Sequence, residues 1–371
     1  MHSPRSLLLI TALCLLPATA PRACTTLVLE DGGGLYFARN LDWYWEDGLV
    51  IVNQRQLHKR ALLIAGGKPA EWTVRYGSVT FNQMGQDMPF GGMNEAGLVI
   101  ENMMLYPTVY PERDDRPEVN LLQWIQYHLD TCRTVDEVIA AADQVRPEPP
   151  VFRARIHYLL CDASGAAATI EFLDGKRVVH HGANLPERVL SNSPYAASVG
   201  FLERWKQEGA DPADVTGPGS LERFARAARL AEDFKGDTPR ARIDQAFAAL
   251  EDVRQEDTTV WSVVYEPKTL RIHFRTRSAP SVKIIDFSSL DFTCGKPPQY
   301  AGMADAVGAG AAPNFDRLTP ERHGAYLDRF FREESFIATI GDMRPLAAGI
   351  LGMAQGFRCE PAAAPAAASA R

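Results

Sequence analysis

A cysteine at position 24 follows a leader-like segment and opens the stretch CTTLVLE, residues 24–30. If the chain is cleaved immediately before this residue, Cys24 carries both a thiol nucleophile and a free α-amine. In hydrolases built this way the α-amine acts as the base for the side chain beside it, so no histidine partner is needed. An amine of pKa about 8 and a thiol of pKa about 8.5 can share a proton near neutrality. The sequence therefore predicts an N-terminal cysteine nucleophile.

The first 23 residues have the pattern of a secretory signal. Arg5 gives a positively charged start, residues 7–16 are almost entirely apolar, and Ala-Thr-Ala at 18–20 matches a small-residue cleavage site. The apolar stretch is too short to span a bilayer. Cleavage after Ala-Thr-Ala would leave residues 21–23 as a short propeptide, whereas cleavage three residues later would expose Cys24 directly. We expect a periplasmic or secreted protein without a membrane anchor; a lipidated Cys24 is the alternative.

The composition excludes several classes of partner. The chain holds 39 Lys and Arg against 46 Asp and Glu, a formal net charge of −7, and it has no basic cluster, so we expect no nucleic-acid partner. It contains neither an HExxH nor a CxxC motif, and we predict no metal site and no cofactor. A GxSxG nucleophile elbow is absent too.

The elements that must position Cys24 follow from hydrophobic patterning. Aliphatic, β-branched and aromatic runs broken by Gly, Asp and Pro predict strands, and apolar residues at helical spacing predict helices. The expected strands cover residues 24–30, 34–38, 49–53, 60–65, 70–81, 155–162, 167–173, 177–181, 258–265 and 270–287, with a turn at 92–98 leading into another strand. The expected helices cover residues 119–131, 134–145, 197–208, 220–234, 239–252 and 320–334. This order predicts an α+β fold of two stacked antiparallel sheets between helical layers.

A hairpin that begins at Cys24 would bring the end of its second strand back to the cysteine. Arg39 and Asp42 lie at that end. A nearby cation lowers the pKa of a thiol, so Arg39 is a candidate partner of the thiolate. Asp42 would hold and orient the α-ammonium group. The alternative is that Arg39 and Asp42 form an ordinary surface ion pair.

The character of the chain changes at residue 292. Pro297-Pro298, a Gly/Ala stretch at 307–312 and an Ala/Pro-rich tail predict a peripheral extension with a disordered end. We therefore divide the chain into a leader with a short propeptide (1–23), a catalytic αββα domain (24–291) and a C-terminal helical extension (292–371).

Five cysteines remain after the leader, which allows one nucleophile and up to two disulfides in an oxidising compartment. Cys294 and Cys359 bracket a segment that looks like an addition, and they are the preferred pair. Cys132 and Cys161 are explained as simple buried thiols.

A set of motifs, in order along the chain, resembles the choloylglycine hydrolase family of N-terminal nucleophile (Ntn) hydrolases, which includes bile salt hydrolases and penicillin V acylases. They are Cys24, ARNLD at 38–42, GMNEAGL at 92–98, LSNSP at 190–194 and ERF at 222–224. The resemblance runs from residue 24 to about 290. It implies a four-layer αββα sandwich and an amidase that cleaves a linear amide C–N bond through an acyl-cysteine intermediate, without a cofactor.

The resemblance also assigns roles to individual residues. Cys24 matches the nucleophile, Arg39 the arginine beside the thiolate, and Asp42 the carboxylate that contacts the α-amine. Asn192 matches a side-chain donor near the reacting carbonyl, and Arg223 a further active-site arginine. If the resemblance is set aside, the sequence favours an Asn-Ser-Pro turn for Asn192 and a solvent-exposed charge on a helix for Arg223.

Two departures from the family pattern concern the substrate and the assembly. Met104 stands where the family has an Asn or Tyr oxyanion contributor, and Asn102, two residues earlier on the same strand face, is the substitute. The segment between Asn192 and Arg223 is shorter than in the bile salt hydrolases of Gram-positive bacteria, whose insertion helps build a tetramer. A homo-oligomer is therefore left open. The short segment resembles the Gram-negative branch, which accepts penicillin V and acyl-homoserine lactones.

Trp43, Asn102 and Met104 are the candidate substrate-binding residues. Aromatic and methionine side chains near Cys24 would line an apolar acyl pocket, although a role in the core fits them equally. We expect a small-molecule amide substrate with an apolar acyl group. Two alternatives remain: an acyltransferase that passes the same thioester to an amine, and a secreted binding protein with an inactive site, which Met104 favours.

Overall fold

The computed structural model describes residues 24–148, 155–208, 217–255, 258–305, 307–334 and 342–360. The expected leader (1–23) and the Ala/Pro-rich tail from residue 361 lie outside the described residues. None of the helices in the described part of the chain is long and apolar enough to cross a bilayer.

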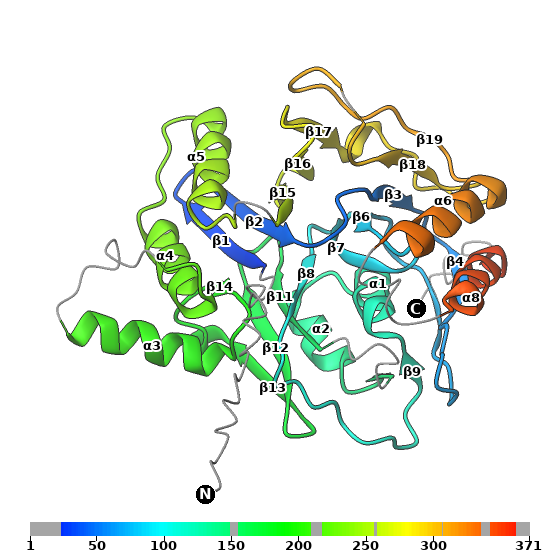
Figure 1. The fold of residues 1–371 in the computed structure, drawn as a ribbon, viewed down its shortest axis with the longest axis horizontal. Helices are drawn as coiled ribbons and strands as arrows, with labels where there is room; N and C mark the ends of the chain where they lie inside the picture. Colours follow the sequence, from blue (N-terminus) through cyan, green and yellow to red (C-terminus); the bar gives the residue numbers. More distant parts are fainter. Residues whose placement is uncertain are drawn as a thin grey trace, which may run out of the picture.

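Two large antiparallel sheets, of six and nine strands within the described residues, form the centre of the molecule (Figure 1). The smaller sheet has the order β14 (Val189–Leu190), β1 (Thr25–Asp31), β2 (Gly34–Asp42), β15 (Thr259–Glu266), β16 (Arg271–Thr276) and β17 (Lys283–Asp286). The larger sheet has the order β13 (Lys176–His181), β12 (Ala167–Leu173), β11 (Ile156–Cys161), β8 (Val99–Met104), β7 (Pro89–Asn94), β6 (Ser78–Asn82), β3 (Leu49–Asn53), β18 (Gln299–Gly302) and β19 (Asp316–Arg317).

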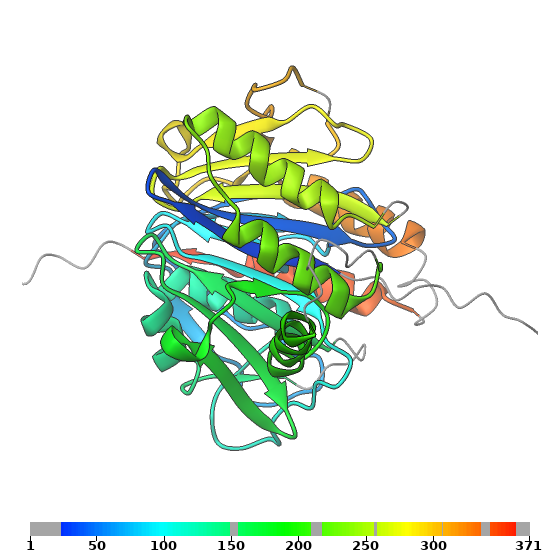
Figure 2. The ribbon, with the colours of Figure 1, turned by 90° about the vertical axis from the view of Figure 1, so that its left-hand side faces the viewer.

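Helices cover the outer face of each sheet. On the smaller sheet, α4 (Ser220–Glu232) packs against β1 and β14, and α5 (Pro239–Asp252) packs against β2 and β15, as Figure 2 shows from the side. α3 (Tyr195–Gln207) packs beside α4. On the larger sheet, α1 (Leu121–Thr131) lies against β7 and β8, and α2 (Val135–Ala141) adds Val135 and Val138 to the same apolar layer. These layers confirm the predicted α+β fold.

The layer between the sheets is largely apolar and contains edge-to-face pairs of aromatic rings. Phe37 of β2 and Phe81 of β6 each meet the ring of Tyr265 of β15 edge to face, with centroids 6.0 Å apart in both pairs. Such contacts add to the free energy of burying the rings themselves.

Local sequence signals explain several element boundaries. α5 begins where Thr238 accepts a hydrogen bond from the Ala241 amide and Pro239 takes the first helical position, so the predicted helix at 239–252 is confirmed. α2 is capped by Thr134, whose hydroxyl accepts from the Glu137 amide at 3.2 Å, as the capping-box pattern predicts.

The strand predicted over 60–65 is wrong. β4 (Leu57–Arg60) ends where that strand was expected to begin, and it pairs with β5 (Glu71–Thr73) and β20 (Arg358–Cys359). The amides of Ile64 and Ala65 donate to the Glu148 carboxylate instead of to a strand. Because Glu148 is distant in the sequence, the local residue pattern around Ile64 does not indicate that these amides bind a side chain. The helix α8 (Arg344–Gln355) was not predicted.

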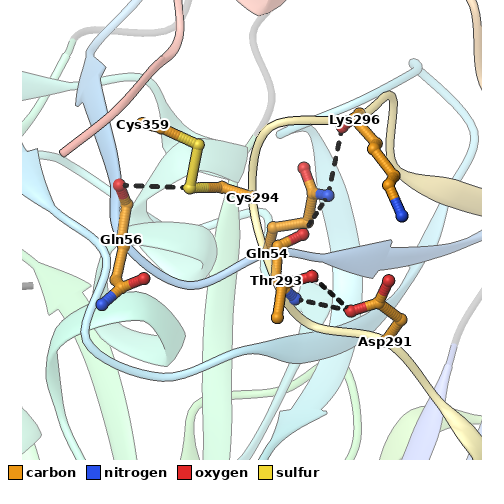
Figure 3. The surroundings of a disulfide bond; sticks show 7 residues. All are labelled: Gln54, Gln56, Asp291, Thr293, Cys294, Lys296 and Cys359. Atoms are coloured by element: carbon orange, nitrogen blue, oxygen red, sulfur yellow. Dashed lines mark hydrogen bonds between the residues drawn. A yellow bond between two sulfur atoms is a disulfide. The ribbon is translucent and has the colours of Figure 1, made fainter. Parts of the chain in front are cut away.

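The part of the chain after residue 291 joins the larger sheet. β18 pairs with β3 and β19, and α6 (Pro320–Glu333) packs against α8. The Cys294–Cys359 disulfide (Figure 3) ties the end of this part beside Gln56 and is the preferred pair of the sequence. Cys132 and Cys161 are buried free thiols, as expected. The boundary at 291/292 stays a prediction.

Candidate active site

Cys24 lies immediately before β1, at the end of the hairpin that the sequence predicts. The register of β1 on β2 pairs Thr26 with Arg39 and Thr25 with Asn40, so the end of β2 lies beside the cysteine. Cys24 is buried, with 4% of its surface exposed. Since side chains alternate across a strand, Cys24, Thr26 and Arg39 share one face of the sheet.

Arg39 points into the layer between the sheets and is fully buried. Its Nε lies 3.0 Å from Glu101 Oε2 of β8, and its Nη2 donates to the Asn102 carbonyl at 3.2 Å. Tyr265 donates its hydroxyl proton to the other Glu101 oxygen. Within the described residues, Arg39 Nη1 has no hydrogen-bond partner. The alternative prediction, a surface ion pair between Arg39 and Asp42, is therefore wrong. Arg39 pairs with Glu101, and Arg39 and Asp42 are both buried.

Room for Glu101 comes from a glycine on the neighbouring strand. Gly91 lies across from Glu101 in the β7–β8 register, and a Cβ atom at Gly91 would clash with the Glu101 carboxylate. A side chain at this position would displace the carboxylate that holds Arg39. This close approach explains why the strand needs glycine here.

Asp42 ends β2 and is also buried. One of its oxygens accepts the hydroxyl proton of Thr259, which lies opposite it on β15. Its Oδ2 is buried and has no partner among the residues that the structure describes. A free acceptor thus remains at the end of β2.

Arg223 approaches Cys24 from the helical layer on the opposite face of the sheet. This side chain of α4 is buried, and its Nη1 donates to the Cys24 carbonyl at 2.8 Å and to the Thr25 hydroxyl. Its Nη2 donates to Asn192 Oδ1 at 3.2 Å, and Asn192 Nδ2 donates to the Met104 carbonyl at 2.8 Å. The solvated-charge interpretation of Arg223 is wrong. Asn192 does lie in the loop between β14 and α3, but its amide belongs to the Cys24 network.

The electrostatics follow from this burial. Burial raises the pKa of the Cys24 thiol, while the charges of Arg39 and Arg223 work against the rise. Burial alone would lower the pKa of Arg39, but the charges of Glu101 and Cys24 raise it, so the guanidinium stays protonated. Burial also raises the pKa of Asp42 to about 6 and that of Glu101 to about 7. A thiolate at Cys24 would therefore depend on the two arginines.

The candidate substrate-binding residues lie in different surroundings. Trp43 meets the ring of Phe90 edge to face at 6.2 Å, and Asn102 donates its amide to the Phe90 carbonyl at 2.9 Å, so the three residues are contiguous. The Met104 side chain packs against the apolar layer under α1 and α2, and its carbonyl is what meets Asn192.

Sequence reasoning missed Glu101, Tyr265 and Thr259, which hold Arg39 and Asp42. Glu101 gave a signal, since it is the one carboxylate in the otherwise apolar or amide-bearing strand VIENMM. Tyr265 and Thr259 gave none, because their partners are set by the packing of one sheet on the other or by pairing far along the chain.

Comparisons with known proteins agree on one family. The family model described as linear amide C–N hydrolases, choloylglycine hydrolase family, matches residues 24–264. A penicillin V acylase of Pectobacterium atrosepticum is 29% identical over 317 residues, 73% of this chain and 82% of that protein. A bile salt hydrolase/transferase of Bifidobacterium longum is 26% identical over 173 residues, 44% of this chain and 53% of that protein.

Solved structures give the same picture. Penicillin V acylase from Agrobacterium tumefaciens matches with a TM-score of 0.69 and 25% identity, covering 80% of this chain and 98% of that chain. A variant of conjugated bile acid hydrolase from Clostridium perfringens matches with a TM-score of 0.63 and 18% identity, covering 78% and 99%, and this likeness concerns the fold.

Proposed function

The chain belongs to the choloylglycine hydrolase family and is an amidase of linear C–N bonds, and from this premise we propose that Cys24, freed as the N-terminal residue, is its nucleophile. The observation that carries the proposal is a buried cysteine with a guanidinium on each face of its strand. Arg39 Nη1 and Asp42 Oδ2 are buried without partners in the described part of the chain, which supports a role for both atoms at the reacting groups.

The proposed reaction passes through a thioester. The α-amine of Cys24 takes the thiol proton, and the thiolate, stabilised by Arg39 and Arg223, attacks the amide carbonyl. Asn192 Nδ2, which has a second hydrogen besides the one given to Met104, donates to the developing oxyanion. The α-ammonium, held by Asp42, returns its proton to the leaving nitrogen as the C–N bond breaks. The amine then takes a proton from water as the water oxygen attacks the thioester carbonyl. The C–S bond breaks to release a carboxylic acid, and the α-ammonium returns its proton to the Cys24 sulfur.

For the substrate we propose an N-acyl amide with an aromatic or apolar acyl group, such as penicillin V, with N-acyl-homoserine lactones as a second class. The contiguous Trp43, Phe90 and Asn102 support this choice, because two aromatic rings beside a single amide suit an apolar acyl chain. The match to penicillin V acylases along most of their length points in the same direction.

We also propose that residues 1–23 are removed during export to the periplasm or the medium, since only cleavage before Cys24 supplies the α-amine. Removal by signal peptidase alone and self-removal of residues 21–23 both give this end. Loss of maturation in a Cys24→Ala variant would identify self-removal.

The test is a hydrolysis assay on the purified mature protein. Penicillin V, N-acyl-homoserine lactones, conjugated bile salts and N-acyl amino acids are each incubated with wild type and Cys24→Ala, and the released acid and amine are quantified. We expect wild type to release phenoxyacetic acid from penicillin V and Cys24→Ala to release none. Turnover by Cys24→Ala at the wild-type rate would refute the mechanism, and inactivity of wild type on all four would refute the substrate class.

Acyl transfer is a second candidate activity, favoured by the relative that is named a hydrolase/transferase. The same thioester would then react with an amine instead of water. Adding an amino acid to the assay and measuring the new amide against the free acid separates the two activities. The remaining alternative, an inactive binding protein, rested on Met104, and its carbonyl already supports Asn192.

A further inference from the structure

A buried histidine and glutamate lie between the sheets beside the loop that carries Asn192. His157 belongs to β11 of the larger sheet, and its Nε2 is 2.8 Å from the carbonyl of Ser191, which follows β14 of the smaller sheet. Its Nδ1 is 2.9 Å from Glu171 Oε1 of β12, and both side chains are completely buried. The histidine thus joins the two sheets at the end of the sandwich where the candidate site lies.

Both neighbours of the His157 ring are hydrogen-bond acceptors. A neutral imidazole has one donor and one acceptor nitrogen, so only the doubly protonated ring can donate to both. Glu171 supplies the opposite charge, and its Oε1 also accepts from the Tyr195 amide, the first residue of α3, at 3.0 Å. The pair therefore anchors both ends of the short loop between β14 and α3.

The same loop is fixed from its other side by the start of α4. Ser191 donates its hydroxyl proton to the Ser220 carbonyl at 2.8 Å, and the backbone N–H of Asn192 donates to Ser220 Oγ at 2.9 Å. Ser220 opens the helix that bears Arg223, which in turn bonds to the Asn192 side chain. His157 is thus the support of the loop from the larger sheet, and Ser220 its support from the helical layer.

We propose that His157, neutralised by Glu171, is a positioning residue that holds Asn192 at the correct distance from the carbonyl attacked by Cys24. This inference rests on the proposed function and adds a residue that the family motifs of the sequence do not contain. His157 touches no reacting atom in this account. It acts through the Ser191 carbonyl.

The test compares kcat and KM for penicillin V among variants. Replacing His157 by Leu alone leaves the Glu171 carboxylate buried without its partner, so the informative variant is His157→Leu combined with Glu171→Met, which removes both charges together. We expect kcat to fall about 10- to 100-fold with KM within about 2-fold, since losing an oxyanion donor outright costs about 10²- to 10³-fold. His157→Gln, which keeps a donor for Ser191, should restore part of the rate.

His180→Gln is the matched control. His180 Nδ1 lies 4.0 Å from the other oxygen of Glu171 and 3.1 Å from the Thr169 hydroxyl, and its ring centroid is 4.6 Å from that of Tyr195. Among the described residues it makes no hydrogen bond to Ser191 or Asn192. We expect its kcat to stay near wild type. A fall equal to that of the His157 variant would overturn the proposal, because it would show a general sensitivity of this region.

A double-mutant cycle decides whether His157 acts through Asn192. If it does, the variant that combines Asn192→Ala with His157→Leu and Glu171→Met should be no slower than Asn192→Ala alone. Multiplied losses, or an unchanged kcat after removal of the His157–Glu171 pair, would overturn the positioning role while leaving the nucleophile intact. Turnover by Cys24→Ala, measured in the same series, would instead overturn the proposed function and the positioning role together.

Discussion

Two of the buried charged clusters in the described part of the chain differ in how their cations are held. The Cys24 cluster consists of Cys24, Arg39, Asp42, Glu101 and Arg223 at the end of the smaller sheet. The Lys59 cluster consists of Lys59, Asp87 and Asp130, with Trp72 and Gln126 around them.

In the Lys59 cluster the cation lies between two carboxylates, and both oxygens of Asp130 accept hydrogen bonds. Lys59 Nζ lies 2.7 Å from Asp87 Oδ1 and 2.9 Å from Asp130 Oδ2, and Asp130 also accepts from Trp72 and Gln126. These bonds join β4, α1 and the loop before β7. In the Cys24 cluster a donor of Arg39 and an acceptor of Asp42 are buried without partners among the described residues.

Asp87 Oδ2 and Gln126 Oε1 of the Lys59 cluster are also buried without hydrogen-bond partners in the part of the chain that the structure describes. The difference therefore lies in the cation: two carboxylates hold Lys59, whereas Arg39 keeps an N–H donor without a partner among those residues, in the cluster that contains Cys24. We expect the Lys59 cluster to serve stability and the Cys24 cluster to serve catalysis.

The largest expected contrast comes from removing the nucleophile. Cys24→Ala should lower kcat/KM for penicillin V by at least about 10³-fold, because no other group can form the thioester. The free energy of unfolding should change by about 1 kcal/mol or less, since only one small buried sulfur is lost. Steady-state kinetics and urea unfolding check both parts. A large loss of stability would make Cys24 part of the structural framework.

Lys59→Met should produce the opposite pattern. Removing one partner of a buried ion pair leaves uncompensated charge and costs about 3–5 kcal/mol. We expect urea unfolding to show this loss, while kcat of the folded enzyme stays within about 2-fold of wild type. A fall in kcat without a loss of stability would mean that the two clusters are coupled.

Removing the Cys294–Cys359 disulfide tests whether the region around Lys59 contributes to stability and not to catalysis. Phe357, two residues before Cys359, lies over Lys59 with its ring centroid 5.2 Å from Nζ. Replacing Cys294 and Cys359 by serine should cost about 2–4 kcal/mol of stability. Thermal unfolding of the wild type with and without reductant, and of the serine variant, measures this loss of stability. The control is kcat at 25 °C, which should be unchanged.

The pH dependence of stability should come partly from the Cys24 cluster. Burial raises the pKa of Glu101 to about 7, above its value of about 4.5 in an unfolded chain, so the native state binds the proton more tightly. Stability should therefore fall as pH rises from about 4.5 to about 7, by up to about 3 kcal/mol for this group. Glu101→Gln should flatten the curve of unfolding free energy against pH in that window. An unchanged slope would contradict the assignment.

The sequence predicted what depends on local pattern. The hairpin of β1 and β2 and the helix at 239–252 follow from glycines, caps and apolar spacing near one another in the chain. Cys24, Arg39, Asp42, Asn192 and Arg223 came from ordered motifs, and the structure brings all five together.

What the sequence could not reveal depends on the stacking of the two sheets and on contacts distant in the chain. Glu101 as the partner of Arg39 and His157 as the support of Ser191 are contacts across the sandwich. The strand predicted over 60–65 is wrong because residues 61–65 form a loop, and the distant Glu148 binds the backbone amides of Ile64 and Ala65.

The most direct test of the central claim is mass spectrometry of the exported protein after a brief reaction with penicillin V and an acid quench. We expect a chain that begins at Cys24 and an N-terminal peptide that carries one phenoxyacetyl group. Active protein that keeps residues ahead of Cys24, or an acyl group on any other residue, would contradict it.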